Sequence, residues 1–271
     1  MAINMILFKM ELRRNARTLV LWSFIISALI FFTMSLFHSV LEYHQQIIGM
    51  VKIVPIAAMK ARGFGSIDDI FSGLGFYAAN NIVYMMLLGS IYAMVLCSTI
   101  LLKEEYGRTA EFLMSRPISR DEIFLSKMTL AFLNIIFLNL VAGLISLLSL
   151  ETFKSGDFLI SPFLVFTMYT LLLNLFFGAL GFLVAALIKR ARPVTFFCVG
   201  LILVFYFLFT ISRISGVKGN FGYLSPFKWV NVDVLNPAYG PEFRRIAVFL
   251  VLIVLLAAGS GFIYRKKDIL T

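Results

Sequence analysis

Long apolar runs alternate along the chain with short segments that gather most of the charged residues. Six runs approach or exceed the ~20 residues that a helix needs to cross ~30 Å of hydrocarbon, and none carries Asp, Glu, Lys or Arg in its interior. The pattern predicts an all-α, polytopic membrane protein whose six transmembrane helices form one transmembrane domain over residues 1–271. The six spans are expected at 18–41, 77–102, 128–150, 162–188, 194–212 and 246–264.

Composition supports this class of protein. Hydrophobic residues make up 61% of the chain, charged residues make up 14%, and the mean hydropathy is +0.94. Such values lie outside the range of soluble domains, so lipid must solvate much of the surface. The two cysteines, Cys97 and Cys198, lie inside apolar runs and are expected to be buried thiols. The net charge of +10 does not indicate nucleic acid binding, because the basic residues gather at the ends of the runs.

The orientation follows from the distribution of lysine and arginine. Fifteen of the 24 basic residues lie on the side that holds both termini, 103–127 and 189–193, whereas the acidic residues divide equally between the two sides. The positive-inside rule therefore predicts that both termini and 103–127 face the cytoplasm.

Residues 3–17 contain an apolar stripe in which Ile3, Ile6, Leu7 and Met10 recur at helical spacing among charged residues. This spacing predicts a separate helix that lies in the inner headgroup layer before the first span. The alternative is a frayed leader. A cleaved signal peptide is not expected, because the following apolar run is too long and lacks a small-x-small cleavage site.

Two long loops are expected on the outer side, at 42–76 and 213–245. In the first, Ser66 followed by Asp69 is typical of a cap for a short helix that leads into the second span. The second is dense in aromatic residues, which suits the membrane–water boundary. Its stretch 228–235 is expected to form a short interfacial helix or part of a re-entrant hairpin; the alternative is a surface loop anchored by its rings.

Amides are the strongly polar side chains inside the spans. An amide in lipid usually forms a hydrogen bond across a helix interface, and binding a substrate is the alternative role. Small residues spaced four apart also indicate close helix packing. The amides are Asn80, Asn81, Asn134, Asn139 and Asn174, and the small pairs are Gly89 with Ala93, Gly181 with Ala185, and Ala257 with Gly261.

Several catalytic patterns are missing from the sequence. It contains no G-x-x-x-x-G-K-[ST] phosphate-binding loop and no H-E-x-x-H zinc motif. The two histidines, His38 and His44, have no partner set for a metal ion. We therefore expect no cofactor, no metal and no catalytic residue in this chain, which leaves a conduit or a scaffold that takes its energy from another protein.

The segment 103–127 holds ten charged residues, five of each sign, between two apolar runs. Glu104 with Arg108, and Arg108 with Glu111, have the spacing of stabilising helical pairs. Pro117 interrupts this helix, and Ser119 followed by Glu122 forms a capping box that starts the next one. A solvated turn needs only a few residues, so 25 patterned residues favour a docking element.

The segment E-E-Y-G-R-T-A-E-F-L-M-S-R-P-I-S-R-D-E-I-F-L-S-K, from Glu104 to Lys127, resembles the cytoplasmic loop between the second and third spans of ABC-2 type ABC transporter permeases. The N-terminal helix, the six spans, the aromatic hairpin before the last span and the R-K-K-D tail are also similar to that family. The long first outer loop departs from this layout.

The resemblance implies that 103–127 contains a cytoplasmic coupling helix, which fits a groove on a separate ATPase subunit. Lys127 also matches the motif. ATP and Mg²⁺ would be bound by that subunit, and a second permease subunit, identical or different, would complete the path across a bacterial plasma membrane. The implied docking residues are Glu104, Glu105, Tyr106, Gly107, Arg108, Thr109 and Glu111, and Pro117, Ser119, Arg120 and Glu122 would set the loop geometry.

The first hypothesis is therefore the permease subunit of an ATP-driven exporter, with membrane lipid as its other partner. A membrane-embedded enzyme or secondary carrier is one alternative, although ionisable residues facing a cavity were not found in the spans. A non-transporting scaffold subunit is the other. The sequence leaves the substrate open among peptides, lipids, drugs and ions.

Overall fold

The computed structural model describes residues 5–51, 57–59, 64, 66–106, 119–153, 158–188, 194–214, 220–236 and 238–266. Within these ranges the protein is helical and contains no strand. The α-helices are α1 (Met5–Ser35), α2 (Phe37–Glu42), α3 (His44–Val51), α5 (Gly73–Asn81), α6 (Gly89–Tyr106), α8 (Arg120–Phe153), α9 (Ile160–Leu187), α10 (Val194–Ile214) and α11 (Phe243–Lys266). Shorter elements are the 3₁₀-helices η1 (Asp68–Phe71), η3 (Asn220–Leu224) and η4 (Pro226–Trp229), and the π-helix η2 (Ile82–Leu88).

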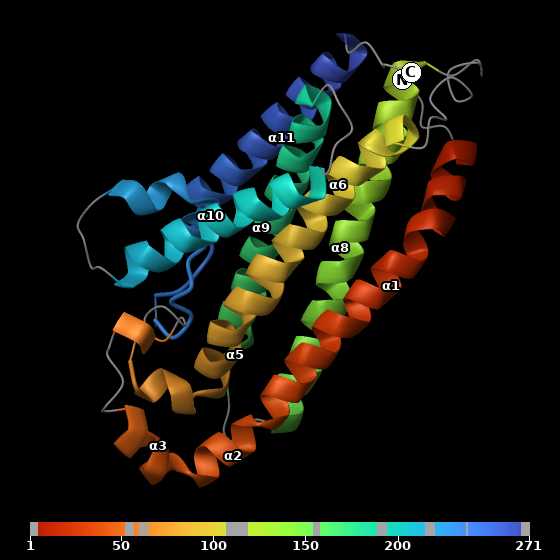
Figure 1. Cartoon of the computed structure of the whole chain (residues 1–271). Coiled ribbons are helices and arrows are strands. Elements are labelled where there is room, and N and C mark those ends of the chain that lie inside the picture. The colour runs from red at the N-terminus through yellow and green to blue at the C-terminus, as the bar shows by residue number, and fades with distance from the viewer. Residues whose placement is uncertain are drawn as a thin grey trace.

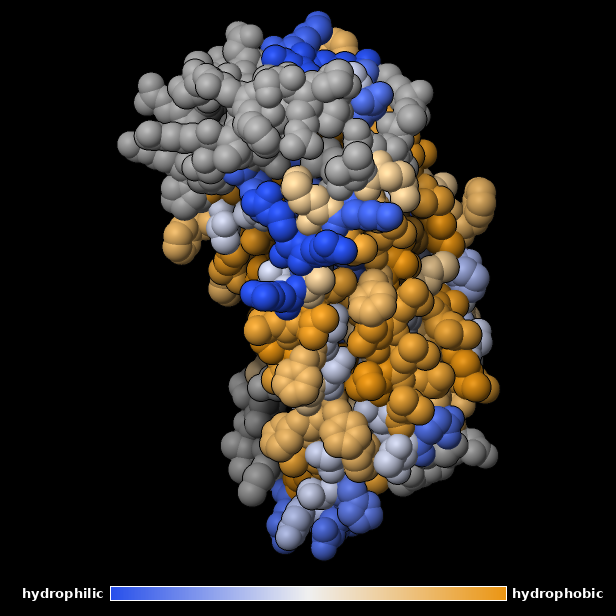
Figure 2. Space-filling view, turned by 90° about the vertical axis from the view of Figure 1, so that its right-hand side faces the viewer, coloured by the Kyte–Doolittle hydropathy of each residue, from blue (hydrophilic) through white to orange (hydrophobic). Residues whose placement is uncertain are grey.

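Six helical segments of the described chain are long and apolar enough to cross a membrane, which confirms the all-α, six-span prediction. The axes of helices α1, α6, α8, α9 and α11 are roughly aligned, with chain directions that alternate, whereas α10 lies strongly tilted across them (Figure 1). An apolar band with hydrophilic residues at both ends covers the face that contains α1 and α8 (Figure 2). Such a band is the surface that hydrocarbon solvates.

The expected boundary between an interfacial helix at 3–17 and a first span at 18–41 is wrong. Helix α1 continues without a break from Met5 to Ser35. Arginine and lysine are good helix formers, and no glycine or proline interrupts the basic stretch, so charge alone does not end the helix. At about 1.5 Å per residue the helix is about 46 Å long, enough to cross the hydrocarbon and extend beyond it.

The second span combines three helical segments. Ser72 caps α5, since its Oγ accepts a hydrogen bond of 3.4 Å from the Gly75 amide. The π-helix η2 follows, and the Gly89 amide donates to the Tyr84 carbonyl five residues earlier. Helix α6 then continues to Tyr106. A π-helix contains one residue more per turn than an α-helix needs and is a rare element.

Glycines bring α6 and α9 into close contact. A Cβ atom at Gly181 would lie 2.5 Å from the carbonyl oxygen of Met94, and one at Gly89 would lie 2.8 Å from Nδ2 of Asn174. On the other side of the bundle, a Cβ at Gly261 of α11 would lie 3.1 Å from the Phe124 ring of α8. The small-residue pairs of the sequence therefore mark real helix contacts.

Buried amides connect the same helices. Ser90 Oγ of α6 donates to Asn174 Oδ1 of α9 at 3.1 Å, and Asn174 Nδ2 donates to Asn139 Oδ1 of α8 at 3.1 Å. This confirms that Asn139 and Asn174 bond across helix interfaces. In contrast, Asn80 donates within its own helix, to the Phe76 carbonyl.

The chain between α10 and α11 enters the helix bundle. Ser225 Oγ donates to the Phe205 carbonyl, midway along α10, at 2.7 Å. The Phe227 ring is fully buried, 5.2 Å from the Phe177 ring of α9. Three structures were expected for 228–235: a short interfacial helix, part of a re-entrant hairpin, or a surface loop anchored by its rings. The packing of the preceding residues against α9 and α10 favours the re-entrant hairpin, and the helical part is confined to the short η4.

Candidate coupling site

The predicted docking residues and the residues predicted to set the loop geometry divide into three groups. Glu104, Glu105 and Tyr106 are the last residues of α6, and Ser119, Arg120 and Glu122 stand at the start of α8. The remaining residues lie outside the described part of the chain: Gly107, Arg108, Thr109, Glu111 and Pro117. The structure therefore describes the two helices that support the segment 103–127, and the docking role of the segment stays a prediction.

The capping box at the start of α8 is confirmed. The Glu122 amide donates to Ser119 Oγ, and the Ser119 amide donates to Glu122 Oε2, both at 3.3 Å. These reciprocal bonds satisfy two amides that the helix itself leaves unpaired. Helix α8 accordingly begins at Arg120, and the third span, expected from 128, extends without interruption into the charged segment.

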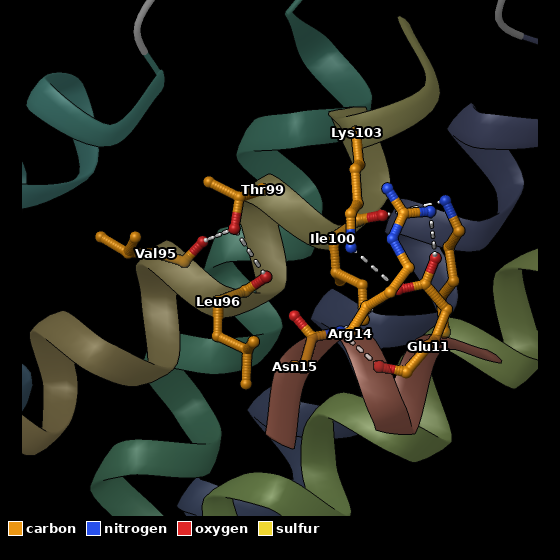
Figure 3. Close-up of polar contacts among 9 residues, drawn as sticks. Glu11, Arg14, Asn15, Val95, Leu96, Thr99, Ile100 and Lys103 are labelled. Atoms are coloured by element: carbon orange, nitrogen blue, oxygen red, sulfur yellow. Dashed lines mark hydrogen bonds and ion pairs between the residues drawn. The ribbon is translucent and has the colours of Figure 1, made fainter. Parts of the chain in front are cut away.

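A buried carboxylate joins α1 to the end of α6. Glu11 is 1% exposed, and its Oε2 lies 3.3 Å from the Lys103 ammonium (Figure 3). The Arg14 guanidinium is 3.9 Å from the other oxygen, and Asn15 Nδ2 donates to Oε2 at 3.2 Å. Burying an ionised carboxylate is unfavourable unless such partners surround it. The cluster therefore fixes α1 to α6 one residue before Glu104.

A buried lysine joins α8 to α6. Lys127 is 0% exposed, and its Nζ donates to the Ile100 carbonyl at 2.9 Å; the acceptor is labelled in Figure 3. A fully buried lysine occurs almost only where hydrogen bonds or charges compensate for its lost hydration. Lys127 therefore holds the first turns of α8 against the last turns of α6.

Helix α11 reaches the same region. The Arg265 guanidinium forms an ion pair with Asp121 in the first turn of α8. Arg120 Nη1 also donates to the Arg265 carbonyl, at 3.2 Å. Through these contacts the ends of α1, α6, α8 and α11 meet around the base of the segment 103–127.

Sequence reasoning missed most of this support. Glu11 and Lys103 are 92 positions apart, and no local pattern pairs them. Lys127 was identified only by its match to a motif, which does not indicate burial. The described residues contain no group of three or more His, Cys, Asp or Glu that could hold a metal ion.

The sequence matches a known protein family. The family described as ABC-2 family transporter protein matches residues 5–269, which include every span and the segment 103–127. A comparison with curated protein sequences gives no significant match. The chain therefore belongs to the ABC-2 family and is a transmembrane permease of an ABC transporter.

Proposed function

We propose that the chain is the permease subunit of an exporter that is driven by a separate cytoplasmic ATPase docked on residues 103–127. The observation that carries the proposal is the convergence of four helix ends at the base of this segment. Two ion pairs and a buried lysine hold these ends together. A movement of the ATPase would thereby be transmitted to the transmembrane helices.

ATP binding and hydrolysis belong to the ATPase subunit in this proposal. This chain lacks a phosphate-binding loop, so the ATPase subunit would bind ATP and Mg²⁺ and hydrolyse the nucleotide. Two permease subunits would enclose the path. The resemblance of 103–127 to ABC-2 permeases supports the docking role.

The cytoplasmic location of 103–127 can be tested by cysteine labelling in intact cells. In a background with Cys97→Ala and Cys198→Ala, a membrane-impermeant maleimide should label Ser155→Cys and leave Ser115→Cys unlabelled until the cells are permeabilised. The expectation rests on the basic residues that flank the inner ends of the spans. Labelling of Ser115→Cys alone in intact cells would reverse the orientation and remove the docking hypothesis.

Docking itself can be tested by charge reversal within the segment. Glu105→Arg or Arg108→Glu should leave membrane insertion near normal but abolish co-purification of the ATPase, because mismatched charges at a partly desolvated contact cost several kcal/mol. The matched control is Arg17→Glu, which reverses an exposed charge near the same end of the bundle and should change stability by at most ~0.5 kcal/mol. Normal co-purification and transport by both segment variants would show that 103–127 is an ordinary turn.

A further inference from the structure

A cavity of about 470 Å³ lies at the end of the bundle opposite to the segment 103–127. Its wall is formed by the start of α5, the last turn of α10, the chain that follows η3 and the first turn of α11. Five charged residues line it: Arg213, Lys228, Arg245, Asp69 and Asp233. These charges lie where the last turn of α10, the η4 segment and the first turn of α11 meet.

Arg213 has an unused hydrogen-bond donor. Its Nη1 atom is buried and has no hydrogen-bond partner in the described part of the chain. Asp69 and Asp233 line the same cavity, but neither accepts a bond from this nitrogen. The guanidinium carbon instead lies 5.7 Å from the centre of the Phe209 ring. A buried donor without an acceptor costs about 1–3 kcal/mol, and more when it is charged, so an anion in the cavity would remove this cost.

Lys228 adds a second cation to the same wall. Burial lowers the pKa of its ammonium group, and the nearby charges of Arg213 and Arg245 lower that pKa further. Among the described residues Lys228 has no ion-pair partner, whereas Arg245 is paired with Glu242 at 2.7 Å. Lys228 therefore lies beside two like charges from other helices, and a bound anion would add an attraction that offsets this repulsion.

A second cavity, of about 390 Å³, adjoins the first along the start of α11. The two share Tyr223, Lys228 and Arg245, and the second is also lined by Trp229, Glu242, Arg244 and Val248. Val248 is 43% exposed, on a helix whose exposed side chains are largely apolar. A ligand that occupied both cavities would therefore place a charged group among the cations and an apolar part along α11.

We propose that the paired cavities bind a membrane lipid through its phosphate-bearing headgroup. The phosphate would accept hydrogen bonds from Arg213, Lys228 and Arg245, because guanidinium and ammonium groups form the strongest such bonds with phosphate oxygens. The acyl chains would pass Trp229 and Val248 into the bilayer. Free phosphate has the same headgroup chemistry but would leave the apolar-flanked cavity without an occupant. The proposal does not depend on the ATPase.

The position of Trp229 allows a site-specific test. The sequence has one other tryptophan, Trp22, so in Trp22→Phe protein Trp229 is the only fluorescent indole. We would titrate the full-length protein, in a phosphate-free non-ionic detergent, with phosphatidylglycerol brominated on its acyl chains. The same acyl chains on brominated diacylglycerol provide the control without phosphate. Half-maximal quenching by phosphatidylglycerol should need at least about tenfold less lipid, since a charge-assisted bond is worth about 1.5–3 kcal/mol.

Variants test whether the difference in quenching between the two lipids arises in the cavity. Arg213→Gln with Lys228→Gln should make the two lipids quench equally, whereas Arg17→Gln, with the same charge change per site outside both cavities, should retain the difference. Lys228→Arg keeps the cation and should also retain it, which separates loss of charge from misfolding. Equal quenching of the unaltered site by both lipids, or a preserved difference in the double variant, would overturn the proposal. A change in Trp229 emission with inorganic phosphate but not with phosphatidylglycerol would overturn the lipid assignment.

Discussion

Gly181→Leu should prevent stable packing of the transmembrane domain, whereas Gly259→Leu should be tolerated. A Cβ atom at Gly181 would lie 2.5 Å from the carbonyl oxygen and 3.1 Å from the Cα of Met94. These are backbone atoms of α6 and cannot rotate away, so the helices would have to separate. No atom lies within 4 Å of a Cβ at Gly259. The loss at Gly181 should exceed the ~1–3 kcal/mol typical of overpacked cores.

The two glycines form a matched pair because both lie inside helices. Leucine raises helix propensity by a similar amount at each position, so the difference between the variants reports the contact between α6 and α9. Size-exclusion profiles and thermal unfolding in detergent should show aggregated or unstable protein for Gly181→Leu and near-normal protein for Gly259→Leu. Equal stability of the two variants would contradict the close approach of the two helices.

Glu11→Lys should cause the second large loss of stability. The new ammonium group would stand in a buried position beside Lys103 and Arg14, which now neutralise the carboxylate. Breaking a buried ion pair typically costs about 3–5 kcal/mol because a charge remains without compensation. Lys103→Glu should cost less, since the Lys103 side chain is 28% exposed and water can solvate the replacement.

Exchange of the two residues isolates their interaction. The double variant Glu11→Lys with Lys103→Glu restores opposite charges, so it should unfold at a higher temperature than Glu11→Lys alone. The reference variant is Lys9→Glu, which reverses an exposed charge on the same helix and should change stability little. If the exchange recovered nothing, the contact between α1 and α6 would rest on packing and not on this ion pair.

The sequence was sufficient for the spans because membrane thickness imposes a length that can be read directly from apolar runs. It was also sufficient for the start of α8, because the capping box of Ser119 and Glu122 is a local signal. The end of the N-terminal helix was predicted wrongly. A charged stretch looks like a boundary in hydropathy, but the backbone of α1 continues through it as a helix.

The support of the candidate site could not be predicted, because it depends on contacts between residues far apart in the chain. Glu11 meets Lys103 only after two spans pack together, and the burial of Lys127 depends on the facing surface of α6. Arg213 was likewise predicted to lie in the outer loop 213–245. Its position in the cavity wall depends on how the fold packs the segment after η3, which the hydropathy pattern does not show. The docking surface itself was predicted from the charge pattern of 103–114 and from the resemblance of Glu104 to Lys127 to a family motif.

The π-helix Ile82–Leu88 offsets the rotational register of the two halves of the second span. Each α-helical residue turns the chain by about 100°, so one additional residue in a turn rotates every side chain that follows it. Shifting the wide turn by one position forms one backbone hydrogen bond behind it and opens one ahead, so the number of bonds is unchanged. Only the residues that the wide turn passes change their rotational position, whereas the two halves of the span keep their orientation relative to each other. The half before the π-helix lines the charged cavity through Gly75 and Ala78. The half after it ends at Tyr106, within the segment 103–127.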